Sequence, residues 1–431
     1  MKRFLLVAGL WSCTLSLSWG DAVLTLPDLL RKAREQNPDI QAAERAWKVQ
    51  RAQTGAASAW PDPTVSFIDE RFPHGSSDAP PEKIQHYRIE QPIPFPGKIT
   101  QDTDMKRHEA LIAEAAYRVR VLDVFNDVKM RYFQLYLTDE KIKLAAQAVE
   151  VMRSALGTAQ GRLAANQGGA SDVFMAQGEL RLMENQLFEQ QQQRTLIVIE
   201  LNTLLNQPTE TPLGAAQAPA LRDVPATRAE IQTLAERNAP LYLSALHETN
   251  HSKAMQKRQR LEYAPDFGIM YEYEKADMGD SGRQIGVSMT FPLWFQRPWG
   301  LNQSAEEHVL EAQANAQAMK NMVLKMVGTE YTEIQTHLRL ARNYESDILP
   351  AALANLRVTR QSYAAGQGDF LRLLEAFRTW IERHNEYQEQ VYHTGEHWSE
   401  LERWVGVDPS QAKEALEQTK WDKLENGHAH Q

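Results

Sequence analysis

The stretches Arg162-Leu-Ala-Ala-Asn-Gln-Gly-Gly169 and Ser362-Tyr-Ala-Ala-Gly-Gln-Gly-Asp369 each lie between two long helical patterns. Both contain Ala-Ala followed by Gln-Gly, and the two Gln-Gly dipeptides are 200 residues apart. A glycine-containing turn between two long helices is typical of an antiparallel helical hairpin. The two stretches therefore predict two helical hairpins, and they suggest that the second half of the chain repeats the first.

Apolar residues on both sides of the first turn recur at alternating spacings of three and four residues, which is the spacing of a heptad seam. The seam consists of Ile142, Ala145, Val149, Met152, Leu156, Ala159 and Leu163 before the turn and of Val173, Ala176, Leu180, Met183 and Leu187 after it. Gln190 and Arg194 then interrupt it. The second turn is flanked by Leu349, Leu353, Leu356 and Tyr363 on one side and by Leu373, Ala376, Trp380 and Tyr387 on the other.

The composition argues against a nucleic-acid partner and against disulfide bonds. The 431 residues carry 47 basic and 56 acidic side chains, a formal charge of −9, whereas nucleic-acid binding favours a basic surface. Cys13 is the single cysteine, so no intramolecular disulfide can form. The sequence has no phosphate-binding loop, dinucleotide fingerprint or nucleophile elbow. It therefore predicts no cofactor.

Residues 1–20 have the features of a secretory signal peptide. Lys2-Arg3 precedes an apolar run, and Ser18-Trp19-Gly20 places small residues before a candidate cleavage site at Asp21. Leu10-Trp-Ser-Cys13 loosely resembles a lipoprotein cleavage box, so lipidation of Cys13 stays open. Beyond residue 20 no apolar run approaches the ~18 residues of a membrane helix. The periplasm, secretion and the outer membrane remain as destinations of the exported chain.

Proline-containing segments mark matching boundaries in the two halves. Asn37-Pro38 corresponds to Asn238-Ala-Pro240, and Trp60-Pro61-Asp62 corresponds to Ala264-Pro265-Asp266. Alternating apolar residues after the second of these boundaries predict strands. The predicted first repeat, 21–207, contains a helix, a strand hairpin at 64–94 and a helical hairpin at 99–205. A connector at 208–225 follows. The predicted second repeat, 226–409, contains a helix, a strand hairpin at 266–292 and a helical hairpin at 300–405, and a polar tail at 410–431 ends the chain.

One chain cannot bury all of these surfaces by itself. The helix predicted at 99–165 would be about 100 Å long, since an α-helix rises ~1.5 Å per residue. Two separate strand hairpins are marginally stable alone and leave open edges. Self-association into a closed barrel would cover both the helical seams and the strand edges.

The chain resembles the TolC-type outer-membrane efflux proteins over nearly all of its mature length. The resemblance rests on Leu24-Thr-Leu-Pro-Asp-Leu-Leu30, Asn37-Pro38, Pro61-Asp62-Pro63, Gln91-Pro-Ile-Pro-Phe-Pro-Gly-Lys98, Tyr363-Ala-Ala-Gly366 and Leu373-Leu-Glu-Ala376. It implies a mainly α homotrimer, in which long helical hairpins form a periplasmic α-barrel and four strands per chain contribute to a twelve-stranded transmembrane β-barrel in outer-membrane lipid.

This resemblance also implies a function and partners. The chain would be the passive exit duct of a tripartite efflux system, without catalytic residues, and its partners would be a periplasmic adaptor protein and an inner-membrane pump. The Pro-Phe-Pro-Gly-Lys segment is most similar to the heavy-metal export branch of the family, which makes heavy-metal cations the substrate that the resemblance implies.

Members of this family narrow the periplasmic end of the tunnel with acidic residues and hold it closed by links between hairpins. By resemblance, Glu375 matches one gate carboxylate, whereas Arg372 stands where the family often has the other and could pair with Glu375 along the helix. Asp172 and Tyr363 match positions that link the closed state. The adaptor-contact residues that the resemblance implies are Gln167, Gly168, Gly366, Gln367, Gly368 and Asp369. Ordinary polar surface beside a turn is the alternative for each.

Two other functions stay open from the sequence. His247-Glu-Thr-Asn-His251 matches the His-Glu-x-x-His pattern of zinc metalloproteases, in which Glu248 would be the general base. The extended pattern is absent, because Ala254 and Lys257 stand where Gly and His would follow. An inert periplasmic coiled-coil scaffold would explain the heptads but not the alternating strands.

The remaining histidines are weaker signals. His393 and His397 are four residues apart, and His428-Ala-His430 lies at the end of the chain. Because two ligands are too few for a closed structural zinc site, these patterns predict solvated histidines and no metal site.

Overall fold

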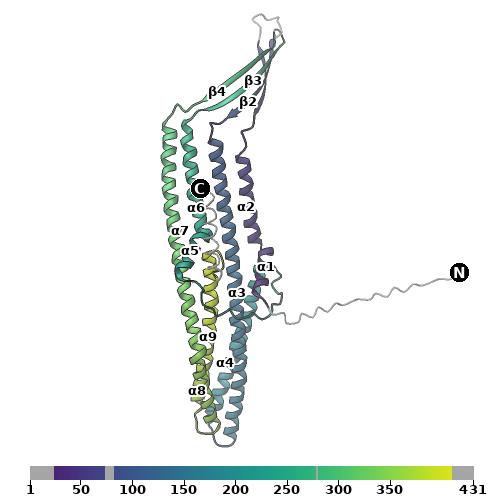
Figure 1. Ribbon diagram of the computed structural model, residues 1–431. Coiled ribbons are helices and arrows are strands. Elements are labelled where there is room, and N and C mark those ends of the chain that lie inside the picture. The colour runs from purple at the N-terminus through teal and green to yellow at the C-terminus, as the bar shows by residue number, and fades with distance from the viewer. Residues whose placement is uncertain (1–23, 73–81, 278–279, 410–431) are drawn as a thin grey trace, which may run out of the picture.

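The computed structural model describes residues 24–72, 82–277 and 280–409, which form one elongated molecule with a bundle of long helices and a small sheet at one end (Figure 1). The mainly α fold with a small β part is confirmed. The predicted signal peptide, including Cys13, and the predicted tail from residue 410 lie outside the described residues. None of the helices in the described ranges combines the length and the apolar character needed to cross a membrane.

The first half runs from a pair of helices through a pair of strands to a helical hairpin. Its elements are α1 (Leu26–Gln36), α2 (Pro38–Ala57), β1 (Thr64–Phe72), β2 (Glu82–Ile93), α3 (Lys98–Ala164) and α4 (Ala170–Leu204). Asn37 separates the first two helices, because its side chain accepts hydrogen bonds from the N–H groups of Asp39 and Ile40 and caps α2. Pro38 follows at the start of α2, where its missing N–H costs no hydrogen bond.

The second half repeats this order. Its elements are α5 (Arg228–Asn238), α6 (Pro240–Arg260), η1 (Leu261–Tyr263), β3 (Asp266–Ala276), β4 (Gly282–Thr290), α7 (Gln296–Asn343), η2 (Tyr344–Ile348), α8 (Leu349–Ala364) and α9 (Phe370–Val405). Thr227 and Glu230 form a capping box at the start of α5, and Pro240 starts α6 as Pro38 starts α2. The matching order confirms the internal duplication.

The second helical hairpin differs in detail from the one predicted at 300–405. β4 ends at Thr290 and α7 already begins at Gln296. The π-helical segment η2 interrupts the path from α7 to α8, and Pro350 lies directly after it. Proline has no N–H to donate to the carbonyl four residues earlier, and a π-helical turn accommodates the lost bond. Heptad spacing did not reveal this break.

The two strand hairpins form one antiparallel sheet in the order β1-β2-β3-β4. Their treatment as separate hairpins is wrong, because β2 pairs with β3 along most of its length, with Tyr87 opposite Tyr273. Glu272 strengthens this junction: its carboxylate accepts a hydrogen bond from Arg88 at 2.8 Å and contacts His86 at 2.7 Å. Among the described strands, only β1 and β4 keep an unpaired edge.

The core of the described helices consists of three clusters. The first lies near the hairpin turns, where α3, α4, α8 and α9 bury Met152 and Leu180. The second joins α5, α7 and α9 around Ile334, and the third joins α1, α3 and α4 around Leu29. Leu163, the member of the predicted seam next to the turn, is 38% exposed. The apolar seam is therefore no longer buried where it meets the turn.

The connector between α4 and α5 is held against the bundle by polar contacts. The N–H of Gln217 donates to the Tyr132 hydroxyl at 2.8 Å. Arg194 pairs with Asp139 at 2.7 Å and donates to the carbonyl of Leu213 at 3.1 Å. The polar residue that interrupts the heptad seam thus binds the connector.

Candidate functional site

The turn between α3 and α4 is closed by backbone hydrogen bonds. The N–H of Gln167 donates to the carbonyl of Arg162 at 2.8 Å, and the N–H of Asn166 donates to the carbonyl of Leu163 at 3.0 Å. This pair of bonds is a Schellman motif, which ends a helix with one residue in the left-handed conformation. Asn166 is that residue, with φ of 58°.

The turn between α8 and α9 repeats the same design. Gln367 donates to the carbonyl of Ser362 at 3.0 Å, and Gly366, with φ of 77°, donates to the carbonyl of Tyr363 at 3.1 Å. A Cβ atom at Gly368 would lie 3.0 Å from the backbone nitrogen of Tyr363, so a side chain would strain the turn. The Gln-Gly dipeptide therefore occurs at both turns because each turn has the same Schellman backbone structure.

The predicted adaptor-contact residues lie on these two turns. Gln167 and Gln367 are exposed, as are Gly366 and Asp369, at the end of the molecule farthest from the sheet (Figure 1). Asp369 also has a local role, because its side chain accepts a hydrogen bond from the N–H of Leu371 and caps α9. The turns present polar side chains and peptide groups that a partner protein could contact.

Arg162 joins the two hairpins at these turns. One terminal nitrogen donates to the carbonyl of Tyr363 at 2.9 Å, and the other donates to the carbonyl of Gln167 at 3.0 Å. The guanidinium also lies over the Tyr363 ring, 4.6 Å from its centroid, which is a cation–π contact. No local sequence pattern predicts this role of Arg162, because Tyr363 is 201 residues away.

Tyr363, one of the predicted gate residues, is buried and lies near Asp172, another of them. Burial raises the pKa of Tyr363, and the charge of Asp172 raises it further against the opposing effect of Arg162. The Tyr363 hydroxyl is buried but forms no hydrogen bond of normal geometry within the described residues. The contacts that join the hairpins therefore use the Tyr363 ring and carbonyl rather than its hydroxyl.

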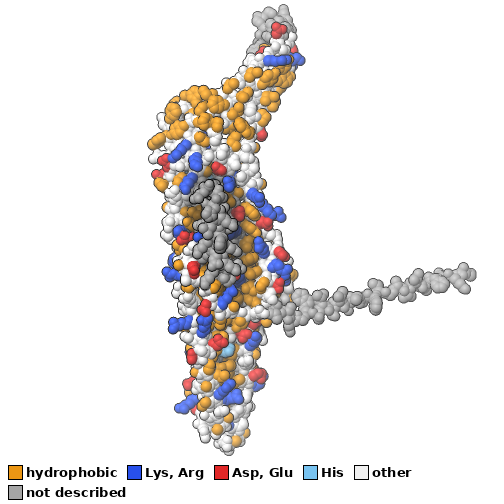
Figure 2. All heavy atoms as spheres, viewed as in Figure 1, with side chains coloured by type: hydrophobic (Ala, Val, Ile, Leu, Met, Phe, Trp, Pro, Cys, Tyr) orange, Lys and Arg blue, Asp and Glu red, His pale blue; other side chains and the backbone are white. Residues whose placement is uncertain are grey.

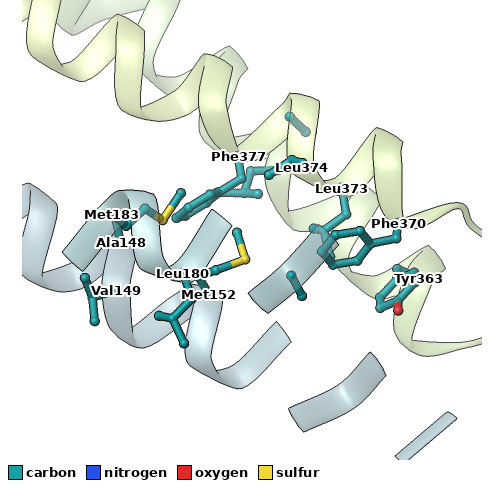
Figure 3. Packing of buried hydrophobic residues seen from close by; sticks show 13 residues of the cluster. Ala148, Val149, Met152, Leu180, Met183, Tyr363, Phe370, Leu373, Leu374 and Phe377 are labelled. Carbon is teal, nitrogen blue, oxygen red and sulfur yellow. The ribbon is translucent and has the colours of Figure 1, made fainter. Parts of the chain in front are cut away.

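Behind this link lies the first core cluster. The Tyr363 ring packs edge-to-face on Phe370 with 5.6 Å between centroids. Figure 3 shows Phe377 of α9 pointing toward Met183 of α4, with further apolar residues of both hairpins around them. The interior between the two hairpins is apolar at this end, and both methionine and phenylalanine side chains fill it.

A second polar link joins the hairpins farther from the turns. Arg378 of α9 donates from Nε to one carboxylate oxygen of Glu179 at 2.9 Å and from a terminal nitrogen to the other oxygen. Glu179 of α4 is buried, so the paired guanidinium satisfies a carboxylate that has little access to water. The two residues are 199 positions apart, so no local sequence pattern predicts their pairing.

The other two gate candidates are exposed on the first turns of α9. Neither Arg372 nor Glu375 forms an ion pair within 4.0 Å in the described part of the chain, so the pairing considered along the helix is not formed. Both charges remain available to solvent, ions or a neighbouring copy.

At the opposite end of the molecule, the sheet has one apolar and one polar face. A row of directly paired residues crosses all four strands on the apolar face: Val65, Ile89, Tyr271 and Ile285, with exposures of 74%, 49%, 42% and 80%. The neighbouring row on the other face is Ser66, Arg88, Glu272 and Gln284. A single chain leaves the apolar face uncovered.

The apolar surface continues from β4 into the start of α7. Exposed residues of this segment are Phe291, Leu293, Trp294, Phe295 and Trp299. Figure 2 shows the hydrophobic side chains gathered over the strands and the adjoining helix ends, whereas charged side chains are spread along the bundle. Aromatic residues at the border of an apolar band are typical of proteins that span the outer membrane.

The His-Glu-x-x-His segment lies within α6. His247 and His251 face α3, where the ring of His247 is 5.9 Å from that of His108 and His251 is 3.4 Å from Glu109. Burial lowers the pKa of His247. Within the described residues, neither His247 nor His251 belongs to a group of three ligand side chains whose ligand atoms lie within 4.8 Å of one another. This arrangement gives the metalloprotease reading no support.

His393 and His397 are partly buried on α9 beside α7. His397 contacts the buried Glu330 carboxylate at 2.7 Å. Burial lowers the pKa of His397, but the hydrogen bond with Glu330 and the negative charges of Glu330, Glu396 and Glu333 together outweigh burial, so the pKa lies above its usual value. The prediction of a solvated histidine is therefore wrong for His397, whereas the His393 side chain is 39% exposed.

Part of the sequence matches a known family. A sequence model described as outer membrane efflux protein matches residues 29–207, the range from α1 to the end of α4. Curated proteins gave no match.

Several solved structures share the fold. CusC has 15% sequence identity, a TM-score of 0.80, and coverage of 89% of this chain and 92% of its own. The outer membrane protein VceC of Vibrio cholerae has 16% identity, a TM-score of 0.77, and coverage of 89% and 96%. The outer membrane channel CmeC of Campylobacter jejuni has 15% identity, a TM-score of 0.76, and coverage of 97% of both chains.

Fold and sequence agree with the resemblance drawn from the motifs. At these identities the solved structures establish the fold, and the family match covers the first repeat. The chain matches the outer membrane efflux protein family over residues 29–207 and has the fold of outer-membrane channels over almost its whole length.

Proposed function

We propose that this chain is the exit duct of a tripartite efflux system, placed in the outer membrane with its helices extending into the periplasm. The observation that carries the proposal is the sheet, whose exposed apolar row from Val65 to Ile285 lies opposite a polar row. Such a sheet suits lipid on one side and a water-filled lumen on the other. The matched family and the channel fold of the solved relatives support the same function.

The working unit that we propose is a homotrimer. Unpaired edges on β1 and β4 favour continuation of the sheet by further copies, because open edges in a long amphipathic sheet otherwise invite aggregation. Three copies supply the twelve strands of one closed transmembrane barrel. Their helical hairpins then surround one axis and form the periplasmic tunnel.

The proposed partners meet the end of the molecule opposite the sheet. A periplasmic adaptor would contact the exposed turn residues Gln167 and Gln367, and it would connect the duct to an inner-membrane pump that supplies the energy. Arg162 would hold the hairpins in the closed state through the ring and carbonyl of Tyr363, with Asp172 beside them as a minor contributor. Three copies of Glu375 would form a ring of carboxylates around the axis, with Arg372 reducing its negative charge.

The duct needs no catalytic centre, and we propose that the chain is not an enzyme. Neither the metalloprotease nor the inert scaffold explains the amphipathic sheet. For the exported substrate we propose heavy-metal cations, on the resemblance of Gln91–Lys98 to the heavy-metal export branch. Deletion of the gene should then lower resistance to such cations without changing their uptake.

A matched pair of strand variants tests the proposed membrane position. Ile285→Lys puts a charge on the apolar face, which costs about 2–4 kcal/mol near the middle of a bilayer. Gln284→Lys puts the same charge on the polar face, opposite Glu272, where it meets a carboxylate. We expect trimer in the outer-membrane fraction to fall for Ile285→Lys and to persist for Gln284→Lys. Equal amounts of both variants, or a soluble periplasmic monomer for the unchanged protein, would contradict the proposal.

A further inference from the structure

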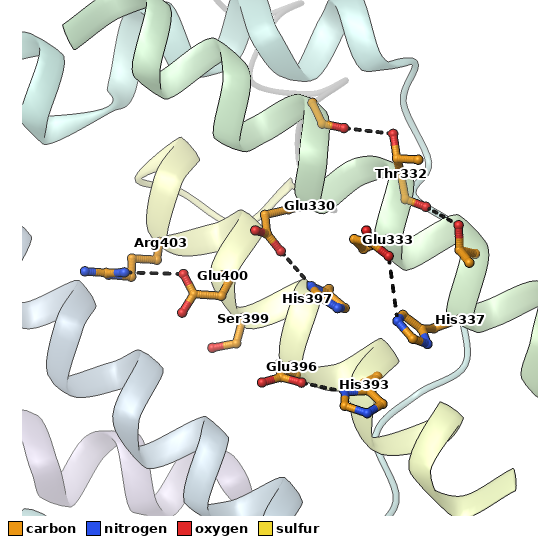
Figure 4. A network of polar contacts seen from close by, with 12 residues as sticks. Glu330, Thr332, Glu333, His337, His393, Glu396, His397, Ser399, Glu400 and Arg403 are labelled. Carbon is orange, nitrogen blue, oxygen red and sulfur yellow. Dashed lines mark hydrogen bonds and ion pairs between the residues drawn. The ribbon is translucent and has the colours of Figure 1, made fainter. Parts of the chain in front are cut away.

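Histidine and glutamate side chains gather where α7 and α9 lie side by side (Figure 4). Glu330, Glu333 and His337 lie on α7 at spacings of three and four, so they share one helix face. His393, Glu396 and His397 lie on α9 at spacings of three and one. None of these residues has a part in the proposed duct.

The three imidazole rings form a compact triangle. The ring centroid of His337 is 4.9 Å from that of His393 and 5.2 Å from that of His397, and the latter two are 6.4 Å apart. One ligand atom from each of Glu333, His337 and His397 lies within 4.8 Å of the other two. The same holds for His393, Glu396 and His397, so His397 belongs to both groups.

Each ring has its Nδ1 atom held by an acceptor. His397 contacts Glu330, His393 contacts Glu396 and His337 contacts the amide oxygen of Gln390, each at 2.7 Å. A carboxylate only accepts hydrogen bonds, so Nδ1 carries the hydrogen of the neutral ring and Nε2 carries the free lone pair.

A histidine whose Nδ1–H donates to a carboxylate or an amide oxygen is the usual form of a metal ligand, because the acceptor fixes the orientation of the ring and raises its basicity. No hydrogen bond joins any of the three Nε2 atoms to another described residue, and a carboxylate oxygen of Glu333 lies 3.8 Å from Nε2 of His337. If the histidines served only to pair with carboxylates, each carboxylate would need a single imidazole. It does not account for three imidazoles in contact with one another.

We propose that His337, His397 and Glu333 bind one divalent transition-metal ion of the zinc class, with His393 as the fourth ligand, and that Glu330 and Gln390 orient the rings. Imidazole and carboxylate ligands suit Zn²⁺ and its neighbours in the first transition row. Bonds of about 2.0 Å in a tetrahedral site place ligand atoms about 3.3 Å apart. Small side-chain rotations bring the present group to that spacing, since Glu333 and His337 are already 3.8 Å apart.

Such an ion would join α7 to α9 in the middle of the second hairpin. The two helices pack there through the second core cluster, which includes Ile334 of α7 and Trp398 of α9 next to the ligands. This site is independent of the duct, because it needs neither a membrane nor a partner protein. Its proposed role is to stabilise the contact between the two helices.

Calorimetric titration of the detergent-purified full-length protein with Zn²⁺ tests the site. The protein should carry a tag without histidines, and the background His428→Ala/His430→Ala should remove the tail as a competing ligand. We expect one ion per chain. His337→Ala and His397→Ala should each weaken binding at least ~10-fold, and Glu330→Gln, which changes only the orientation of His397, should weaken it about 10-fold. Bound Co²⁺ should show the visible absorption of a tetrahedral site.

Two controls make the result specific. His308→Ala removes a histidine of α7 that contacts Glu311 and has no ring contact with another imidazole of the described residues, and binding should be unchanged. Glu333→Gln changes a partly exposed ligand and leaves the packing intact, so it tests the site even if the histidine variants fail to fold. Absence of saturable binding at one ion per chain would overturn the proposal. Equal affinity for the parent, His337→Ala and Glu333→Gln, or loss of binding only in His247→Ala, would also overturn it.

Discussion

Removal of the Arg162 guanidinium should open the periplasmic end of the duct. Two of its contacts cross between the hairpins: the hydrogen bond to the carbonyl of Tyr363 at 2.9 Å and the cation–π contact with the Tyr363 ring. A hydrogen bond of this kind contributes roughly 1–1.5 kcal/mol, and a cation–π contact at a partly exposed site adds about 0.5–1 kcal/mol. Arg162→Ala should therefore remove about 2 kcal/mol of closed-state stability per chain.

A loss of this size changes populations measurably. Since ~1.4 kcal/mol corresponds to tenfold in an equilibrium constant, the ratio of open to closed states should rise about 30-fold for independent chains. Single-channel recording of the purified protein in a planar bilayer measures this ratio directly. Arg162→Lys keeps the charge over the ring but loses the planar fork of donors, so it should show an intermediate effect.

Tyr363→Phe is the matched control for this mechanism. The Tyr363 hydroxyl has no hydrogen-bond partner of normal geometry within the described residues, and the variant keeps both the ring and the carbonyl that Arg162 contacts. Its open fraction should stay close to that of the unchanged protein, and addition of Asp172→Ala should have a small effect. If Tyr363→Phe opened the channel as strongly as Arg162→Ala, the link would reside in the hydroxyl and Asp172, and our assignment to the guanidinium would be refuted.

Three further predictions concern other residues. Arg378→Met leaves the buried Glu179 carboxylate unpaired, so it should lower the midpoint of thermal unfolding measured by circular dichroism. The double variant Arg378→Met/Glu179→Leu should recover most of this loss. Equal midpoints for the single variant and the unchanged protein would argue against the link. Glu375→Ala should weaken block of the channel by divalent cations several-fold, and Arg372→Ala should strengthen it, as measured by conductance in rising cation concentration. Glu248→Gln should leave export unchanged in a resistance assay, and loss of a zinc-dependent peptidase activity in this variant would revive the enzyme reading.

Local sequence patterns predicted the helices, turns and strands well where a residue type favours a single backbone structure at its position. Asn37-Pro38 separates two helices because an asparagine cap and a proline can only start a helix there. The Gln-Gly dipeptides mark both Schellman turns, since each turn requires a left-handed residue just before a close backbone approach. Alternating apolar residues predicted strands in both halves, and β1 to β4 lie within the two predicted strand hairpins. These features depend on neighbours within a few residues.

The parts that sequence reasoning missed depend on residues far apart in the chain. Arg162 and Tyr363, Glu179 and Arg378, and the pairing of β2 with β3 all join positions that are about 170–200 residues apart, and no local pattern encodes such a meeting. The histidine cluster was missed for the same reason, because His337 lies on α7 whereas His393 and His397, the pair recognised in the sequence, lie on α9. The proposed adaptor contacts and the proposed gate ring would depend on other chains, so a single sequence carries little information about them.

The number of strands in one chain determines how copies can continue the sheet. Strands alternate in direction from β1 to β4, so β4 runs opposite to β1, and the next copy can pair its β1 with this β4 as another antiparallel neighbour. Because the number is even, every added copy points the same way and its helical turns reach the same end. The contact is heterologous, with a different edge on each side, so it generates rings with a rotation axis rather than two-fold pairs. An odd number of strands would have inverted each second copy or forced a parallel junction.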